Sequence, residues 1–179
     1  MPICMYGALG DALSAPVATN PFDLEIEALA HVLQSEAGNY SEAERLAVGW
    51  VVRNRARKSH TTIYAMEFPW REQHGGSPPF ASIQTPVARD YHLAKRILQS
   101  PLKDDPTGAA TSYFEPDQQD KAAKLGAIYR ANRKTRPELK RFAPYHDDAD
   151  TIRSRWQARG ERPLATVGRF ELWHTPRAA

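Results

Sequence analysis

Residues 29–55, LAHVLQSEAGNYSEAERLAVGWVVRNR, carry the strongest structural signal in the chain. Before the turn, apolar residues recur at a spacing that fits one broad face of an α-helix better than the alternation of a strand. Asp23 is a suitable N-cap for this helix, and Gly38 can adopt the left-handed conformation that ends a helix. Ser41 has Glu44 three residues later, which is the spacing of a capping box. The stretch therefore predicts two helices joined by a tight turn.

The second of these helices is apolar on most of its sides, so we expect it in the core of the protein. Its apolar residues are Leu46, Ala47, Val48, Trp50, Val51 and Val52. A further helix is expected from about Val87 to Gln99, with Val87, Tyr91, Ala94, Ile97 and Leu98 on its buried face. Residues 56–81 contain repeated Gly and Pro and are expected to be rich in loops.

Glu36 is an acidic residue placed where the first helix ends. A carboxyl group at this position faces the negative end of the helix dipole, and packing of the helices would partly remove it from water. Both effects raise the pKa of a carboxyl group. A carboxylic acid that stays protonated near neutral pH can donate a proton to a glycosidic oxygen. The alternative is that Glu36 is a solvated residue at a helix end.

A second informative stretch is residues 105–116, DPTGAATSYFEP. Asp-Pro-Thr-Gly is typical of a turn, and the residues from Thr111 to Phe114 favour an extended strand. Pro116 is expected to end that strand. Tyr113 and Phe114 can alternate between the core and the surface, and this arrangement would need no functional role.

Together these stretches resemble the spore-cortex-lytic, SleB-type, family of cell-wall hydrolases. The first stretch has the family's turn in Ser35-Glu36-Ala37-Gly38, followed by Ala47-Val48 and a Val-x-Asn-Arg ending at Arg55. The second has the family's Asp-Pro-Thr segment, with Ala109 where the family usually has glycine. Residues 166–174 are expected to form one final strand. The ending after Val167-Gly168 is also similar to that of the family, although Phe170 replaces the usual histidine, so no role of that histidine is transferred.

The resemblance implies a single α+β, mainly helical, lysozyme-like domain over residues 23–179, preceded by an arm of residues 1–22. It also implies that Glu36 is the catalytic acid and that Thr111 and Tyr113 contact the glycan. Two further substrate contacts are suggested by residue type. Gln84 could hydrogen-bond a sugar or serve at a helix entry, and Trp70 could stack on a sugar or cover the core.

The implied reaction is cleavage of the β-1,4 bond between N-acetylmuramic acid and N-acetylglucosamine in peptidoglycan. Glycosidases with two carboxylates need a second acid at a defined separation. The sequence offers none in a setting comparable to that of Glu36, because Asp105 and Glu115 are better interpreted as turn and surface residues. A single acid suits a lytic transglycosylase, while an N-acetylmuramidase remains open. No cofactor is expected.

Composition leaves other classes open. The 179 residues have a formal charge of +3 and a pI of about 9.1, which fits an anionic polymer such as cell wall or nucleic acid. The basic run at residues 121–136 is either a solvated face or a cradle for such a polymer. No groove-reading motif supports nucleic-acid binding. Cys4 lies in the arm and gives little support to a cysteine peptidase or amidase. A non-catalytic wall-binding protein is the third alternative.

Two further expectations concern metals and location. The acidic segment at residues 145–150 does not match a calcium loop, so no metal site is expected. Asp150 or Thr151 is instead expected to be the N-cap of a helix through Ile152 and Trp156. Residues 1–20 contain no Lys or Arg, and no stretch is apolar enough to span a membrane, so neither a secretory signal nor a membrane span is expected. These features suggest a toxin injected into the periplasm of a rival cell, as by a type VI secretion apparatus, or a phage-type lysin. A toxin implies a cognate immunity protein that covers Glu36.

Overall fold

The structure, a computed structural model, describes residues 20–67 and 85–176. These residues form a mainly helical α+β protein with one three-stranded antiparallel sheet, which confirms the α+β, mainly helical part of the expected fold class. The α-helices are α1 (Pro21–Ala37), α2 (Glu42–Lys58), α3 (Ile63–Glu67), α5 (Ala88–Gln99), α6 (Pro116–Ala131) and α7 (Ala149–Ala158). Two 3-10 helices, η1 (Leu102–Asp104) and η2 (Pro137–Phe142), and the strands β1 (Ser112–Phe114), β2 (Arg162–Val167) and β3 (Phe170–His174) complete the set. None of the described helices is long and apolar enough to cross a membrane.

The predicted pair of helices is confirmed in α1 and α2, with differences at the ends of α1. Asn20, not Asp23, is the N-cap, and its side chain accepts a hydrogen bond from the Phe22 amide at 2.9 Å. Pro21 explains the earlier start, because proline suits the first position of a helix. Gly38 is not left-handed, since its φ is −54°. A Cβ atom there would lie 2.6 Å from the Gln34 carbonyl oxygen, so glycine is needed for space.

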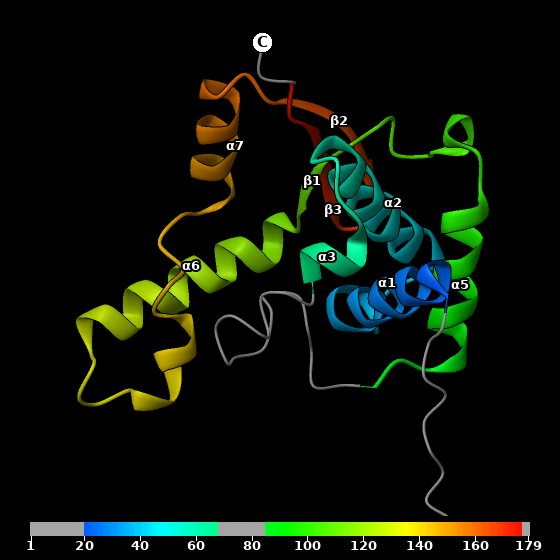
Figure 1. Cartoon of the computed structure of the whole chain (residues 1–179). Coiled ribbons are helices and arrows are strands. Elements are labelled where there is room, and N and C mark those ends of the chain that lie inside the picture. The colour runs from blue at the N-terminus through cyan, green and yellow to red at the C-terminus, as the bar shows by residue number, and fades with distance from the viewer. Residues whose placement is uncertain (1–19, 68–84, 177–179) are drawn as a thin grey trace, which may run out of the picture.

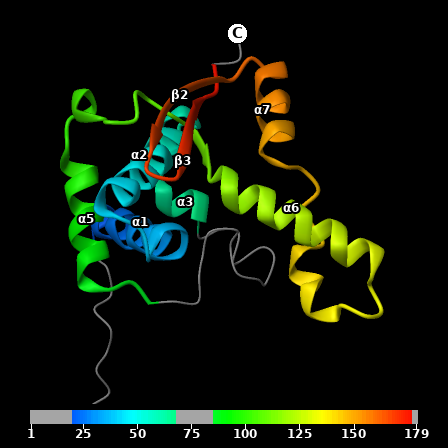
Figure 2. The same cartoon turned by 180° about the vertical axis from the view of Figure 1, so that it is seen from behind.

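The core lies where α1, α2, α3 and α5 pack together, and Figures 1 and 2 show these helices gathered on one side of the sheet. The second helix is buried over most of its length, as predicted. Its fully buried residues pack against those of α1 and α5 in one apolar cluster. That cluster includes Leu29, Leu33, Val48, Val51 and Ile97. The core therefore holds α1 and its carboxyl end rigidly against α2.

The buried face of α5 differs from the prediction. Val87 and Tyr91 are 46% and 37% exposed, and Asp90 is fully buried instead. The Asp90 carboxylate pairs with the buried guanidinium of Arg45 on α2 and also accepts a hydrogen bond from the Val87 amide at 2.8 Å. A buried charge is unfavourable unless its partner is buried with it. The pairing with Arg45 therefore turns Asp90, and not Val87 or Tyr91, toward the core.

A short helix, α3, occupies part of the segment that was expected to be loop. Its first amides are capped by a side chain from a different helix. The carboxylate of Glu25 accepts hydrogen bonds from the amides of Ile63 and Tyr64 at 2.8 and 2.9 Å. Such a cap satisfies donors that a helix start leaves open, and it fixes α3 against α1.

The sheet has the strand order β1-β3-β2. The prediction of one final strand from Thr166 to His174 is wrong, because the chain turns back and β2 and β3 form an antiparallel hairpin. Gly168 at the turn has a φ of +56°, and a Cβ atom there would lie 2.4 Å from the Glu44 carboxylate. Glu44 accepts a hydrogen bond from the Arg169 amide at 3.0 Å while completing the predicted capping box with Ser41. The hairpin is thus attached to the start of α2.

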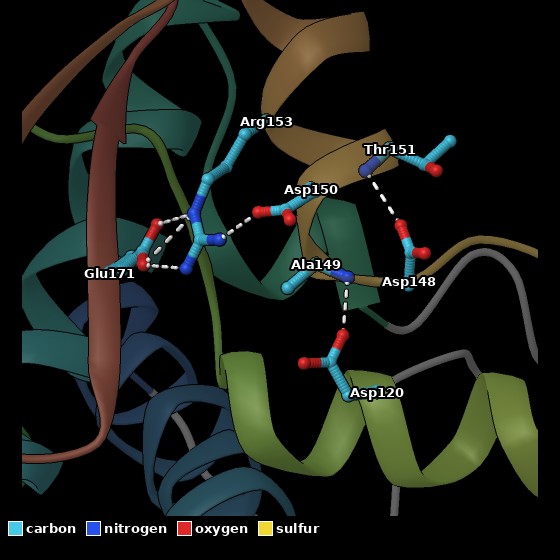
Figure 3. Close-up of polar contacts among 7 residues, drawn as sticks. All are labelled: Asp120, Asp148, Ala149, Asp150, Thr151, Arg153 and Glu171. Carbon is cyan, nitrogen blue, oxygen red and sulfur yellow. Dashed lines mark hydrogen bonds and ion pairs between the residues drawn. The ribbon is translucent and has the colours of Figure 1, made fainter.

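The remaining helices, α6 and α7, lead away from the core, and Figure 1 shows α6 running out from the end of β1. Figure 3 shows how α7 is attached. Arg153 forms ion pairs with Glu171 on β3 and with Asp150, and the Ala149 amide donates to Asp120 on α6 at 2.7 Å. The N-cap of α7 is Asp148 rather than the predicted Asp150 or Thr151.

The contacts of α7 also account for the acidic segment at residues 145–150. Asp147 pairs with Arg155 at 2.6 Å, Asp148 caps the helix, and Asp150 pairs with Arg153 at 2.6 Å. Within residues 20–67 and 85–176, no cluster of His, Cys, Asp and Glu could hold a metal ion. The acidic residues of this segment therefore serve to position α7.

Candidate active site

Glu36 lies in the last turn of α1 and is half-buried. It contributes to a small pocket of about 210 Å³ lined by residues 34–40, which are the end of the helix and the following turn. The Tyr113 hydroxyl on β1 donates a hydrogen bond to Glu36 Oε2 at 3.1 Å. The helix end and the strand that were singled out in the sequence therefore meet at this carboxyl group.

The surroundings of Glu36 change its acidity. Burial raises the pKa of Glu36 above its ordinary value, and the Tyr113 hydrogen bond and the charge of Arg55 oppose this shift without cancelling it. Burial has this effect because removing a carboxylate from water disfavours the ionised form. The environment therefore favours a protonated Glu36 at a higher pH than an exposed glutamate allows. This is the property that a general acid needs.

A second tyrosine forms a parallel link between the turn and β1. The Tyr40 hydroxyl donates to Glu115 Oε2 at 2.6 Å. Burial and then this hydrogen bond raise the pKa of Tyr40 to about 12, so its hydroxyl stays protonated at neutral pH. Glu115 is half-buried and was expected at the surface. Glu36 is thus hydrogen-bonded to Tyr113 on β1, and Tyr40 to Glu115, the residue that follows β1 and precedes α6.

An aromatic stack supports these two hydrogen bonds. Phe170 on β3 is buried and lies edge-to-face between two rings, with centroids 5.2 Å from Tyr40 and 5.2 Å from Tyr113. Edge-to-face packing at this separation is favourable. The Phe170 ring therefore packs against the rings of both tyrosines. In the sequence, Phe170 stands at the position where the SleB-type family usually has histidine.

The end of α2 joins the two sequence motifs. The buried side-chain amide of Asn54 donates to Asp105 Oδ2 at 2.8 Å and to the Ala110 carbonyl at 3.1 Å. Arg55 donates from Nε to the Thr111 carbonyl at 3.1 Å. The Val-x-Asn-Arg ending therefore positions the Asp-Pro-Thr turn and the strand that follows it. These contacts join the two motifs in the structure.

The predicted turn at Asp105 is confirmed. The Asp105 carboxylate accepts hydrogen bonds from the amides of Thr107 and Ala109 at 2.8 and 3.0 Å. Ala109 has a φ of +66°, in the left-handed region that favours glycine. The departure from the family's glycine therefore leaves an alanine in a strained conformation.

The other predicted substrate contacts have different positions. Thr111 is buried, and its hydroxyl is 3.1 Å from that of Thr175 and accepts from the Thr175 amide. These contacts favour a structural role, so contact with substrate through Thr111 stays a prediction. Trp70 and Gln84 lie outside the described residues, as does Cys4.

Three residues of this site, Tyr40, Arg55 and Phe170, were not assigned a role from the sequence. Arg55 lies within the quoted Val-x-Asn-Arg ending, and the polar residues of that motif indicated a role other than packing in the core. Tyr40 follows the turn directly and has the polar tip typical of site residues. Phe170 had no such signal, because its role depends on β3 lying beside β1.

Comparison with models of protein families finds no match for this chain. Comparisons with curated protein sequences and with solved structures likewise find no significant match.

Asn54→Ala should destabilise the fold by about 1–3 kcal/mol, because it removes the side-chain donor of the buried Ala110 carbonyl and one of the donors of the Asp105 carboxylate. Chemical denaturation of the purified variant measures the loss. Asn132→Ala is the matched control, since Asn132 is exposed and its side chain bonds only locally to the Ile128 carbonyl. Equal stability of the two variants would show that Asn54 does not hold the two motifs together.

Proposed function

We propose that this protein is a glycosidase that cleaves the β-1,4 bond between N-acetylmuramic acid and N-acetylglucosamine in peptidoglycan. The observation that carries the proposal is Glu36, a carboxyl group half-buried at a pocket, with a raised pKa and a hydrogen bond from Tyr113. The resemblance to the SleB-type cell-wall hydrolases supports the same role, because the glutamate of that family's turn is its catalytic acid. The helix end facing a small sheet also agrees with a lysozyme-like domain.

The first step is transfer of a proton from Glu36 to the glycosidic oxygen. The bond between this oxygen and the anomeric carbon of the muramyl sugar then breaks, and the N-acetylglucosamine unit leaves with a new hydroxyl group. A carboxylic acid of raised pKa is suited to this step, because more of it is protonated at a given pH than of an exposed glutamate. The ionised Glu36 that remains accepts the hydrogen bond of Tyr113, which stabilises its charge.

The second step is attack on the anomeric carbon by the 6-hydroxyl group of the same muramyl sugar. Glu36 takes the proton of that hydroxyl and returns to its acid form, while the sugar becomes a 1,6-anhydro product. The same carboxyl group thus acts first as an acid and then as a base. Cleavage by a lytic transglycosylase therefore needs one carboxyl group only. Attack by water instead would make the enzyme an N-acetylmuramidase and leave a reducing end.

We also propose that the enzyme acts in the periplasm of a target cell, as an antibacterial effector. The peptidoglycan substrate lies outside the cytoplasmic membrane, so lysis requires delivery to that compartment. A cognate immunity protein would protect the producer by covering the pocket at Glu36. Its most direct contacts would be with the turn at residues 36–40, which carries the catalytic acid and the half-buried Tyr40.

Tyr113→Phe should shift the alkaline limb of the pH profile of kcat/KM to higher pH. The Tyr113 hydrogen bond lowers the pKa of Glu36, so its removal lets burial raise that pKa further. Because the acid form of Glu36 is active, activity is lost as the pH rises through this pKa, and a higher pKa delays the loss. Initial rates of glycan cleavage between about pH 4 and pH 9 measure the shift.

The control for this shift is Tyr145→Phe, which removes a hydroxyl group from a side chain that is 43% exposed and whose ring packs against Phe142 of η2. Its profile should match that of the wild type. A Tyr113→Phe profile that moves to lower pH, or does not move, would show that the tyrosine does not stabilise the ionised form of Glu36.

A further inference from the structure

A second and larger pocket adjoins the Glu36 pocket. Its volume is about 580 Å³, and it lies between the start of α2 and one side of α5. The polar residues that line it are Tyr40, Glu42, Arg45, Arg89, His92 and Arg96, and we call it the arginine pocket. Tyr40 lines both pockets, so a ligand in the arginine pocket lies next to the turn that carries Glu36.

The charges around the arginine pocket do not cancel. Arg45 is paired with the buried Asp90, and Arg96 is paired with Glu42 at 2.6 Å. Arg89 donates a hydrogen bond to the Gly38 carbonyl oxygen, which is a dipole and not a charge. Among the residues that the structure describes, Arg89 forms no ion pair with a carboxylate. The guanidinium charge of Arg89 is therefore available to a ligand in the pocket, which His92 of α5 also lines.

The Arg89 contact also connects this pocket to the catalytic residue. Gly38 lies two residues after Glu36 and lines the Glu36 pocket. Arg89 holds the carbonyl of Gly38 from the side of the arginine pocket. A group bound by Arg89 would thus lie against the same turn that presents the acid. A long substrate could occupy both pockets at once.

We propose that the arginine pocket binds a carboxylate of the peptide stem that peptidoglycan carries beside the cleaved bond. This inference rests on the proposed function. The muramyl sugar at the cleaved bond carries its peptide on a lactyl group, so the stem leaves the glycan close to the sugar on which Glu36 acts. Guanidinium groups are the side chains best suited to bind carboxylates, which they can hold through two parallel hydrogen bonds. The preferred substrate is then a peptide-bearing strand and not bare glycan.

The test compares two substrates prepared from the same sacculi, namely glycan strands with their peptide stems and strands from which an amidase has removed the stems. Arg89→Gln should lower kcat/KM on peptide-bearing strands about tenfold, the order expected for losing a charged hydrogen bond, and change cleavage of bare strands far less. Glu42→Gln should have the opposite effect, since it removes the one acidic residue among those that line the pocket. It should raise kcat/KM on peptide-bearing strands alone.

The matched control is Arg162→Gln, the same change of charge at an exposed residue at the start of β2. This variant should behave as the wild type on both substrates. An equal loss on both substrates for Arg89→Gln, with no gain for Glu42→Gln, would overturn the pocket's role and leave the glycosidase intact. A wild-type protein that cleaves neither substrate would overturn the proposed function, and the inference with it.

Discussion

Glu36→Gln is expected to reduce the rate of peptidoglycan cleavage about a hundredfold or more, which is the order of loss for removing a general acid. Glutamine keeps the shape and the volume of the side chain, and its amide oxygen can still accept the hydrogen bond of Tyr113. It cannot donate a proton to the glycosidic oxygen. Release of soluble fragments from purified sacculi gives the rate for both proteins.

The same variant should be as stable as the wild type or more stable at neutral pH. Because burial raises the pKa of Glu36 in the folded protein, ionisation of this group favours the unfolded state. The free energy of unfolding of the wild type should therefore fall, relative to the variant, as the pH rises above the ordinary pKa of a glutamate. Below that pKa the group is neutral in both states, and the difference should vanish. Denaturation at several pH values measures it.

These two measurements separate catalysis from folding. Loss of activity in a variant of undiminished stability would identify Glu36 as a reacting group. A variant that digests sacculi at nearly the wild-type rate would exclude Glu36 as the acid. A variant that is much less stable at neutral pH would contradict the inference that the buried carboxylate is unfavourable.

The second large effect concerns the compartment. Expression of the wild-type chain in a Gram-negative host should lyse the cells when the protein carries an added periplasmic signal peptide, and should not when it stays in the cytoplasm. The reason is chemical, since assembled glycan strands are found only outside the cytoplasmic membrane. Optical density after induction and microscopy of cell shape provide the measurement.

The control for the compartment is Glu36→Gln carrying the same signal peptide, which should leave cells intact at the same protein level. Lysis by this variant would indicate damage from export alone. Equal toxicity of the wild-type protein from the cytoplasm would contradict a peptidoglycan substrate and favour a target inside the cell.

Much of the local structure could be predicted because its causes lie close together in the sequence. The capping box at Ser41 and Glu44 depends on two residues three positions apart, and it is present. The Asp105 turn is likewise made by a side chain that bonds amides two and four residues later. The start of α1 was misplaced because Asp23 is also a suitable N-cap residue, whereas the helix begins three residues earlier at Asn20 and Pro21.

Features that depend on distant pairs could not be read from the sequence. The rotation of α5 follows from the ion pair between Asp90 and Arg45, which are 45 positions apart. An apolar pattern alone placed Val87 and Tyr91 inside, since it gave no sign that an aspartate would be buried. The hairpin of β2 and β3 was missed because Gly168 divides one extended run, and one glycine can also lie within a strand.

The candidate site likewise has features that could be predicted from the sequence and features that could not. Glu36 was recognised from its position at a helix end and from a family resemblance, and the structure adds the burial and the Tyr113 hydrogen bond that raise and moderate its pKa. The link from Tyr40 to Glu115 spans 75 positions and had no local signal. The arginine pocket likewise joins residues of α2 and α5, which are separated in the chain by residues 59–87.

Mass spectrometry of the products released from purified sacculi shows which bond the protein cleaves and which nucleophile attacks. We expect glycan fragments that end in 1,6-anhydro-N-acetylmuramic acid with the wild-type protein, and none above background with Glu36→Gln. Reducing N-acetylmuramic acid ends would retain the glycosidase and assign water as the nucleophile. Intact glycan strands with cut or detached peptides, or no released fragments at all, would contradict the proposed function.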